Sequence, residues 1–256
     1  MILTIDIGNS RTKWVMFQGE EIQDQGVFAY KANSFRSELL KTKLPFNVDV
    51  VAISNVAGSH LQDELIDVMN ISGVKKYFFA ETQSKAFGVT NGYENFSKLG
   101  VDRWLAMVAA FKDYVLHESK SVCVIDCGTA ITLDLIKSDG DHQGGVIVPG
   151  FRLMCSALNN ATDNIDENIG NNLEVATGLG LTTSDAVRQG CAQLISDGLS
   201  GLIKRFVNIK PENLTCIVTG GDGKWISGML EHETIYDPVL VNKGLLLMAR
   251  EAVEEK

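Results

Sequence analysis

Short apolar runs and amphipathic stretches alternate along the whole chain. Alternation of hydrophobic and polar residues, or a short apolar run between turn residues, predicts a strand, whereas apolar residues three or four positions apart predict a helix. Strands that alternate with helices indicate an α/β layer arrangement. In the first half, strands are predicted near residues 1–7, 13–17, 21–28, 48–55 and 75–79, and helices over 32–42, 61–69 and 101–116.

The second half of the chain repeats this plan. Strands are predicted near 122–126, 130–136, 145–148 and 214–218, and helices from about 151, over 183–206 and over 238–254. No Pro- or Ser-rich linker separates the two halves. We therefore predict an α/β fold of two fused, similar lobes, residues 1–117 and 118–256, with a cleft between them.

One turn motif occurs twice, at corresponding places in the two halves. Asp6-Ile7-Gly8-Asn9-Ser10 is echoed by Asp126-Cys127-Gly128-Thr129-Ala130, and each copy ends an apolar run and precedes a strand-like segment. Each copy predicts a hairpin whose tight turn presents backbone N–H groups beside a carboxylate, and glycine lets that backbone approach a phosphate closely. Two such turns that face each other across a cleft can hold the phosphate tail of a nucleotide. The sequence therefore predicts an enzyme that uses ATP.

Each turn also has a plainer interpretation. In the first, Asp6 would lie near a metal and the phosphates, with Lys13 as a compact charge on the transferring phosphate. Taken alone, this turn is better explained as an ordinary Asn-containing hairpin with a solvated lysine. In the second, Asp126 would bind a cation and Thr129 a phosphate, or Asp126 would only cap its own turn. The repetition favours the functional interpretation of both turns.

Three glycine-containing motifs leave their role open. In Gly100-Val101-Asp102-Arg103, Asp102 can accept a hydroxyl proton and Arg103 can bind a carboxylate. The same pair could instead be a favourable contact with a helix dipole and a solvated cation. Residues 144–150 join a strand to a helix, and either form an ordinary turn or pack closely against a ligand or another backbone. Residues 219–223 either contact a flat adenine or ribose or form a routine loop.

Charge and cysteine content exclude several classes of protein. A formal net charge of −9 argues against a general nucleic-acid surface, which needs clustered Lys and Arg. The five cysteines are scattered and no short-spaced Cys or His motif indicates zinc, so we expect reduced core thiols and a cytoplasmic protein. We expect no signal peptide, because the chain enters a strand directly. We expect no membrane partner, because no apolar stretch approaches the roughly 20 residues that span a bilayer.

Taken in order, four motifs resemble those of the type III pantothenate kinases. They are Asp6-Ile-Gly-Asn-Ser-x-x-Lys13, Gly100-Val-Asp-Arg103, Asp126-Cys-Gly-Thr-Ala-Ile-Thr132 and Gly144-Gly-Val-Ile-Val-Pro-Gly150. The first is general to the acetate/sugar kinase–Hsp70–actin superfamily, whereas the other three together are far more specific. The resemblance runs over essentially the whole chain. In one departure, Phe96 replaces the proline of the family's Tyr-x-Asn-Pro, so the loop that carries Tyr93 loses a fixed φ.

The resemblance implies a fold, a reaction and a site. The fold is that of two duplicated ribonuclease-H-like lobes, the actin-like ATPase fold, in a homodimer. The reaction is the phosphorylation of pantothenate by ATP to 4'-phosphopantothenate, the first step of coenzyme A biosynthesis, with Mg²⁺ and a monovalent cation, K⁺ or NH₄⁺. The implied ATP-binding residues are Asp6, Ile7, Gly8, Asn9, Ser10, Arg11, Thr12, Lys13 and Thr129. The implied pantothenate-binding residues are Tyr93, Gly100, Val101, Asp102, Arg103 and Thr183.

Two of these implied residues have special roles, and one rests on a weaker match. Asp102 is implied as the proton acceptor and Asp126 as the ligand of the monovalent cation. Thr183 comes from Thr182-Thr183-Ser184-Asp185-Ala186, where the family has Asn-Thr-x-x-Ala, so a neighbouring hydroxyl could take its place.

Two other functions stay open. One is a kinase of the same superfamily that acts on a sugar or a short carboxylic acid. The presence of Asp102 and Arg103 in the Gly-x-Asp-Arg motif disfavours this alternative. The other is a non-catalytic nucleotide-binding accessory transcription regulator. This alternative is disfavoured because the chain retains the residues expected of an active enzyme, namely Asp6, Lys13, Asp102, Arg103 and Asp126. A conformational ATPase like Hsp70 or actin is disfavoured, because 256 residues leave no room for the extra subdomains.

Overall fold

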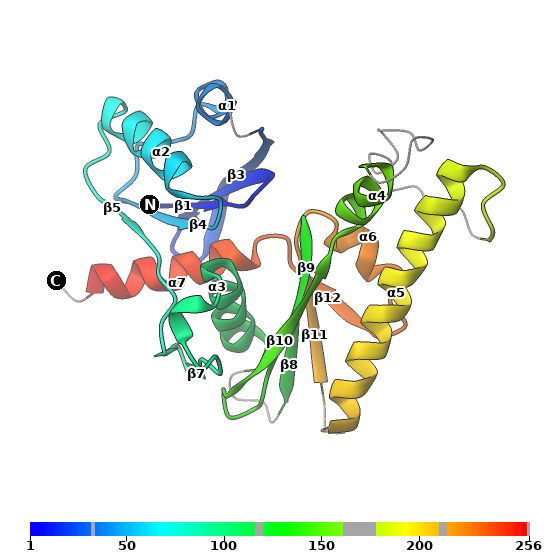
Figure 1. Ribbon diagram of the computed structural model, residues 1–256. Helices are drawn as coiled ribbons and strands as arrows, with labels where there is room; N and C mark the ends of the chain where they lie inside the picture. The colour runs from blue at the N-terminus through cyan, green and yellow to red at the C-terminus, as the bar shows by residue number, and fades with distance from the viewer. Residues whose placement is uncertain (32–33, 116–119, 161–177, 210–213, 255–256) are drawn as a thin grey trace. The chain divides into compact units, whose positions relative to one another are not determined.

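The structure, a computed structural model, describes residues 1–31, 34–115, 120–160, 178–209 and 214–254 (Figure 1). It divides into two compact units, the first made of Met1–Asp113 with Val239–Lys256 and the second of Tyr114–Pro238. In the described part of each unit, helices pack on a five-stranded mixed sheet, and the two sheets share one strand order. These features confirm the α/β class and the duplication that the sequence predicts.

The sheet of the first unit is built around its first strand. Strands β1 (Ile2–Ile7), β2 (Arg11–Gln18) and β3 (Glu21–Ala29) are antiparallel, whereas β4 (Val50–Asn55) and β5 (Tyr77–Phe79) run parallel to β1. The order across the sheet is β3-β2-β1-β4-β5. Short turns are enough for the antiparallel pairs, and the parallel strands are reached through helices.

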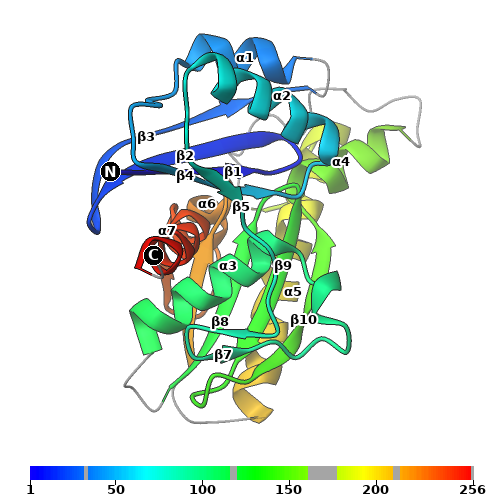
Figure 2. The same cartoon turned by 90° about the vertical axis from the view of Figure 1, so that its left-hand side faces the viewer.

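Helices cover both faces of this sheet (Figure 2). On one face, α1 (Phe35–Thr42) and α2 (Ser59–Ile71) pack over Leu3, Ile5 and Ile7, which are completely buried. These three residues alternate along β1, as expected for a strand whose side chains point to opposite faces in turn. The predicted helix 32–42 begins in the structure at Phe35, and its first two positions lie outside the described residues.

The C-terminal helix α7 (Leu240–Glu254) lies on the other face of the first sheet. The Nδ2 group of its buried Asn242 donates a hydrogen bond to Oγ1 of Thr4 on β1 at 3.0 Å. Helix α7 also packs closely against the helix that begins at Val101. A Cβ placed on Gly244 would lie only 2.3 Å from the carbonyl oxygen of Leu105. A glycine at this position lets the two helices approach each other.

The position of α7 corrects the division expected from the sequence, which assigned residues 118–256 to the second lobe. The expected boundary at 117/118 lies outside the described residues, and the two units meet in sequence at Asp113 and Tyr114. The apolar periodicity of a helix identifies its buried face but not the element that it covers. The first unit is therefore made of two separate stretches of chain.

Short elements precede the helix of the Gly-x-Asp-Arg motif. Strands β6 (Lys85–Ala86) and β7 (Val89–Thr90) pair as a small hairpin, and a 3-10 turn, η1 (Phe96–Lys98), follows. Helix α3 (Val101–Ala110) then continues as a π-helical turn, η2 (Phe111–Val115). The helix predicted over 101–116 is thus present as far as Val115, with a last described turn wider than an α-helical one, and position 116 lies outside the described residues.

The sheet of the second unit repeats the topology of the first. Strands β8 (Ser121–Cys127), β9 (Ala130–Ile136) and β10 (His142–Pro149) are antiparallel, whereas β11 (Leu214–Thr219) and β12 (Thr234–Tyr236) run parallel to β8. The order is β10-β9-β8-β11-β12. The sequence analysis missed β12, because a strand of three residues is too short to show a period.

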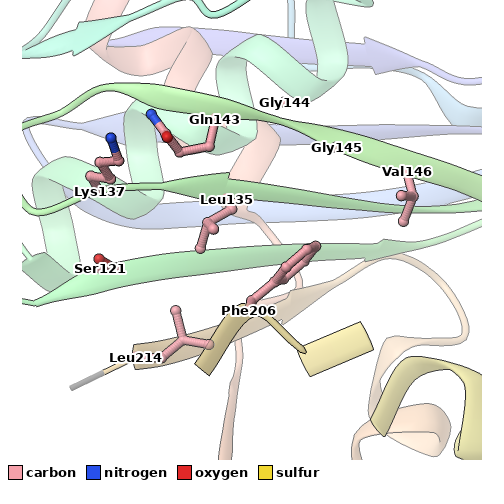
Figure 3. A pocket seen from close by; sticks show the side chains of 9 residues that line it. All are labelled: Ser121, Leu135, Lys137, Gln143, Gly144, Gly145, Val146, Phe206 and Leu214. Carbon is pink, nitrogen blue, oxygen red and sulfur yellow. The ribbon is translucent and has the colours of Figure 1, made fainter. Parts of the chain in front are cut away.

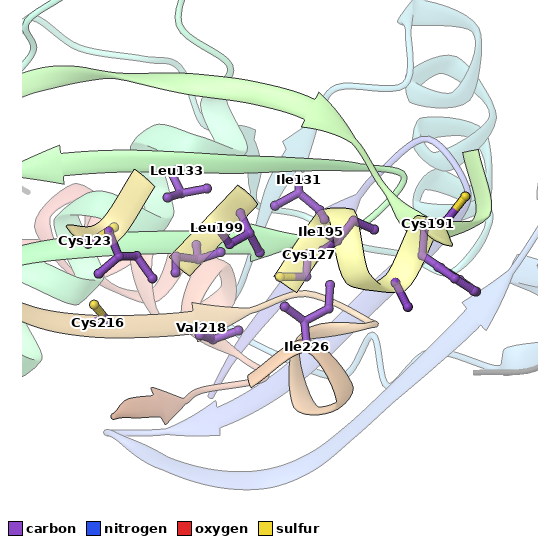
Figure 4. Close-up of a cluster of buried hydrophobic side chains, with 14 of the residues drawn as sticks. Cys123, Cys127, Ile131, Leu133, Cys191, Ile195, Leu199, Cys216, Val218 and Ile226 are labelled. Carbon is purple, nitrogen blue, oxygen red and sulfur yellow. The ribbon is translucent and has the colours of Figure 1, made fainter. Parts of the chain in front are cut away.

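Helices α4 (Phe151–Asn160) and α5 (Thr183–Ile209) pack on one face of the second sheet, and the short α6 (Gly223–Ser227) follows β11. Alternate residues of β8 and β9 point to this side. All five cysteines are buried free thiols, as the sequence predicts. The core (Figure 4) includes Cys123, Cys127, Ile131, Leu133, Cys191, Ile195, Leu199, Cys216, Val218 and Ile226.

Candidate active site

The first repeated turn joins β1 to β2. The backbone N–H of Gly8 donates to the carbonyl oxygen of Arg11 at 3.0 Å. Asp6 is paired with Lys13 of β2 on one side and with Ser54 of β4 on the other. Paired residues project to the same face of a sheet, so a carboxylate, an ammonium and a hydroxyl share one face at the end of β1. This arrangement suits the binding of a phosphate and its cation.

Tyr30 holds this turn, and the sequence analysis missed it. Its hydroxyl donates to the carbonyl oxygen of Gly8, and its backbone N–H donates to the carbonyl oxygen of Ser10 at 3.2 Å. Burial and the negative charge of Asp6 raise the pKa of Tyr30 to about 12, so the hydroxyl keeps its proton at neutral pH. Its signal in the sequence, an aromatic residue after a strand, is too common to indicate this role.

The second repeated turn joins β8 to β9 and differs in the residues around its carboxylate. The N–H of Gly128 donates to the carbonyl oxygen of Ala130 at 3.0 Å. Asp126 is paired with Thr132 of β9 and with Thr219 of β11. Thr132 therefore occupies the place that Lys13 has in the first unit. Asp126 has a hydroxyl on each side, whereas Asp6 has an ammonium on one side, so Asp126 is the better candidate of the two aspartates for the ligand of a cation.

Two glycines pack against the backbone of the second turn. A Cβ on Gly150 would lie 2.3 Å from the carbonyl oxygen of Gly128. A Cβ on Gly220, whose φ is +93°, would lie 2.4 Å from the carbonyl oxygen of Cys127 and 2.5 Å from Oδ1 of Asp126. Both motifs that the sequence left open therefore bring backbone close to backbone beside the Asp126 carboxylate. Neither position has space for a side chain.

An ion pair that the sequence did not reveal links these loops. Nη1 of Arg152, in the first turn of α4, lies 2.5 and 2.6 Å from the two carboxylate oxygens of Asp222. The N–H of Asp222 donates to the carbonyl oxygen of Cys127 at 3.0 Å, and Asp222 is 3% exposed. Burial, together with the charges of Asp126 and Asp222, raises the pKa of the Cys127 thiol well above its usual range. This thiol therefore stays protonated.

The Gly-x-Asp-Arg motif forms the start of α3 and holds an arginine inside the protein. Arg103 is 7% exposed, and its Nη1 donates to the hydroxyl oxygen of Tyr93 at 2.8 Å. Its guanidinium carbon also lies 5.5 Å from the centroid of the Tyr93 ring, within the range of a cation–π contact. The alternative of a solvated cation is therefore wrong for Arg103. The structure brings two of the predicted pantothenate-binding residues together.

Asp102 is held at the first turn of α3 by its neighbours in sequence. Its Oδ1 accepts a hydrogen bond from the backbone N–H of Arg103 at 2.8 Å. A Cβ on Gly100 would lie 2.6 Å from the same oxygen, so glycine leaves the space that this carboxylate occupies.

Asparagine side chains hold the loop of Tyr93, in which Phe96 stands at the position of the expected proline. Oδ1 of Asn91 accepts a hydrogen bond from the N–H of Tyr93 at 3.0 Å. Oδ1 of Asn95 accepts one from the N–H of Ser97 at 3.1 Å and so caps η1. These hydrogen bonds constrain the loop locally.

Thr183 is the first residue of α5, and the preceding threonine caps the helix. Oγ1 of Thr182 accepts a hydrogen bond from the N–H of Asp185 at 3.1 Å and donates one to the Asp185 carboxylate at 2.8 Å. Thr and Asn both serve as N-cap residues, which explains why Thr182 stands where the family has Asn. Since capping occupies the Thr182 hydroxyl, Thr183 is the better candidate for a substrate contact.

The predicted residues divide between the two units. The first unit carries residues 6–13, Tyr93 and 100–103, and the second carries Asp126, Thr129 and Thr183. Among the described residues, no group of three or more His, Cys, Asp or Glu side chains lies close enough to hold a metal ion. A cation at Asp126 would therefore also use hydroxyl, carbonyl or nucleotide oxygens.

Comparisons of the sequence agree on one family. A family model described as type III pantothenate kinase matches residues 2–208. A type III pantothenate kinase of Nitrosococcus oceani is 34% identical, over 98% of this chain and 94% of its own length. One of Methylobacillus flagellatus is 33% identical, over 96% of this chain and 94% of its own length.

Solved structures show the fold. A putative Baf family transcriptional activator from Campylobacter jejuni superposes with a TM-score of 0.62 at 22% identity, covering 98% of this chain and 99% of its own. MreB 5 of Spiroplasma citri bound to AMPPNP gives a TM-score of 0.51 at 11% identity, covering 99% and 98%. At these identities the likeness concerns the actin-like ATPase fold alone. The family model and the relatives above 30% identity go further, and the chain belongs to the type III pantothenate kinase family.

Proposed function

We propose that this protein transfers the γ-phosphoryl group of ATP to the primary hydroxyl of pantothenate, which gives 4'-phosphopantothenate in the first step of coenzyme A biosynthesis. The observation that carries the proposal is the buried Arg103, bound to Tyr93 and next to Asp102 at the start of α3. A guanidinium matches the carboxylate of pantothenate, and a nearby carboxylate matches the hydroxyl to be phosphorylated. The relatives named type III pantothenate kinase support the same reaction.

Asp102 orients the hydroxyl of pantothenate and takes its proton. The positive end of the α3 dipole favours the ionised carboxylate, which is the form that can accept a proton. Phosphoryl transfer passes through a loose transition state in most analyses, so positioning of the hydroxyl matters more than the basicity of the acceptor. Arg103 fixes the other end of the substrate.

Residues 6–13 and Thr129 bind the phosphates of ATP in this proposal. The turn supplies backbone N–H groups, and Lys13, paired with Asp6, supplies a positive charge for the transferring phosphate. Bound Mg²⁺ would neutralise further negative charge on the phosphates. Asp6 and the Ser54 hydroxyl beside it are oxygen donors that fit such an ion or its water shell.

A coupled assay of ADP release tests the proposed function. We expect ADP only when ATP and pantothenate are both present. Release with a sugar or a short carboxylic acid in place of pantothenate would identify another kinase of the superfamily. ATP binding without turnover on any acceptor would instead fit the accessory regulator. No structural observation favours either of these alternatives.

We also propose that Asp126 holds a monovalent cation, K⁺ or NH₄⁺. Its neighbours Thr132 and Thr219 carry hydroxyls, which together with the carboxylate offer the oxygen ligands that such a cation needs. The cation would bridge to phosphate oxygens and so couple its own binding to that of ATP. In sodium the bridge would be weaker, because the smaller ion fits the same oxygens less well.

We expect K⁺ to lower the KM for ATP relative to Na⁺, and Asp126→Ala to remove most of this difference. Initial rates at varied ATP in the two salts, at equal ionic strength, measure it. Asp63→Ala, which removes an exposed carboxylate of α2, is the matched control and should keep the difference. Equal KM values in K⁺ and Na⁺ for the unchanged protein would show that Asp126 only caps its turn.

A homodimer is the proposed assembly. The segment before α5 exposes Leu179 and Leu181 to 94% and 97%, and α5 exposes Leu194. Such apolar side chains at a surface are typical of a protein interface. Helix α3 is a weaker candidate, since residues 103–110 are buried. We expect a dimer in sedimentation at micromolar concentration and a shift toward monomer in Leu194→Glu. A monomer alone for the unchanged protein would contradict the assembly.

The cytoplasm is the proposed location. All five cysteines are free thiols, which fits a reducing compartment.

The net charge of −9 supports the absence of a nucleic-acid partner. None of the described helices is long and apolar enough to cross a bilayer.

A further inference from the structure

A pocket of about 330 Å³ lies in the second unit (Figure 3). It lies at the end of the sheet opposite the Asp126 turn. Ser121 and Leu214, which line it, begin β8 and β11, whereas Asp126 and Thr219 lie near or at the other ends of these strands. Asp126 follows Ser121 by five positions, and Thr219 follows Leu214 by five positions. At the usual rise per residue of a strand, five positions span roughly 16 Å. The volume is at the lower end of the range for small-molecule sites. The pocket is therefore distinct from the proposed ATP site.

The wall of the pocket is apolar. Leu135, Val146, Phe206 and Leu214 line it, and all four are only partly buried. Three of them, Val146, Phe206 and Leu214, pack at the margin of the core of the second unit. The core thus ends in apolar side chains that still have water-accessible surface. Covering that surface with an aliphatic group is favourable.

A β-bulge shapes one edge of the pocket. The register of β10 against β9 shifts between His142 and Gly145, which leaves Gln143 and Gly144 without regular partners. Gly144 has a φ of +93°, and a Cβ placed on it would meet no atom within 4 Å. This glycine is needed for the backbone conformation and not for close packing. Bulges recur beside functional sites because they redirect side chains.

Polar groups lie at one end of the pocket. Figure 3 shows Lys137, Gln143 and Ser121 at the end away from Val146. Lys137 is half-buried, and within the described residues its ammonium forms no ion pair. Asp139 and Asp141 lie in the adjoining hairpin turn, where the carbonyl oxygen of Asp141 accepts hydrogen bonds from the backbone N–H of Lys137 at 3.0 Å and from Nε2 of Gln143 at 3.2 Å. Neither of these carboxylates forms an ion pair with the Lys137 ammonium in the part of the chain that the structure describes. An ammonium beside an apolar wall favours an anion that it can contact directly.

We propose that this pocket binds a small amphipathic carboxylate, with its carboxylate on Lys137 and Gln143 and a short aliphatic body against Leu135, Phe206 and Leu214. An inorganic anion would leave the apolar wall exposed. An aliphatic alcohol would leave the ammonium without a counter-ion. The volume limits the body to a short chain. The site is separate from the residues proposed for catalysis.

Hexanoate is the probe for this proposal. We expect saturable binding by the full chain in isothermal titration, with shifts of Leu and Val methyl signals of the second unit. Lys137→Gln should weaken binding by roughly tenfold or more, since a hydrogen bond to a charged group is lost. Val146→Phe, which fills the pocket, should weaken it as well. The matched control Lys75→Gln, which removes an exposed lysine of the first unit, should bind as the unchanged chain does.

Several outcomes would overturn the proposal. One is the absence of saturable binding at millimolar hexanoate. Another is equal binding of hexanol, because the carboxylate would then have no role. Binding of inorganic phosphate as tight as that of hexanoate would remove the role of the apolar wall. Unchanged affinity in both Lys137→Gln and Val146→Phe would place the ligand elsewhere. ADP release by Lys137→Gln should stay normal, which confirms that this variant is folded.

Discussion

Asp102→Asn is expected to lower kcat by roughly 10² or more, the usual contribution of a group that accepts a proton in the transition state. Asparagine keeps the Oδ1 atom that accepts a hydrogen bond from the N–H of Arg103, so the start of α3 should persist. The amide cannot take the proton of the pantothenate hydroxyl. The loss should therefore appear in kcat, with a smaller change in the KM for pantothenate.

Steady-state kinetics with both substrates varied measure this effect, and circular dichroism checks the fold. Asp63→Asn, on the exposed side of α2, makes the same chemical change away from α3 and should leave kcat unchanged. Near-normal turnover of folded Asp102→Asn would show that Asp102 is not the proton acceptor.

Gly220→Ala is expected to destabilise the protein by about 3 kcal/mol, because it combines backbone strain with an overlap of atoms. The residue has a φ of +93°, and its Cβ would lie 2.4 Å from the carbonyl oxygen of Cys127 and 2.5 Å from Oδ1 of Asp126. To relieve the overlap, the second turn must move. If the second turn binds the phosphates of ATP as proposed, its displacement should also raise the KM for ATP strongly.

Denaturant unfolding gives the change in the free energy of unfolding, and kinetics below the unfolding transition give the KM. Gly228→Ala is the matched control, since Gly228 has a φ of −69° and its Cβ would meet no backbone atom closer than 3.5 Å. If the two variants were equally stable and equally active, the close packing around Asp126 would have no energetic consequence.

Most of the fold could be predicted, because hydrophobic and polar residues are spaced regularly in most of its strands and helices. The strands at 1–7 and 122–126 show continuous apolar runs, and both sheets place them at the centre. Several features could not be predicted, and two of them show why. Strand β12 is too short to have a pattern, and the attachment of α7 to the first unit depends on contacts such as Asn242 with Thr4, which join residues at opposite ends of the chain.

The candidate site was predictable where a motif is local. The two turns and the Gly-x-Asp-Arg segment each lie within a few consecutive residues, so the repetition of the turn and the resemblance to the family indicate them, whereas spacing alone left the role of Asp102 and Arg103 open. Tyr30 and the Arg152–Asp222 ion pair are different, since each acts on a turn that is distant in sequence. A single sequence holds no sign of such pairings. The space around Gly150 and Gly220 shows that backbone packs closely against backbone at both glycine motifs, while an adenine or ribose contact of residues 219–223 stays a prediction.

The return of α7 to the first unit bears on how the chain folds as it leaves the ribosome. The second unit is one continuous stretch, Tyr114–Pro238, and all of it emerges before α7 does. The first unit emerges earlier but lacks Asn242, Gly244 and the rest of α7 until synthesis is almost complete. Domains generally fold as units during synthesis. The half of the protein that is made first is therefore the half that completes its fold last.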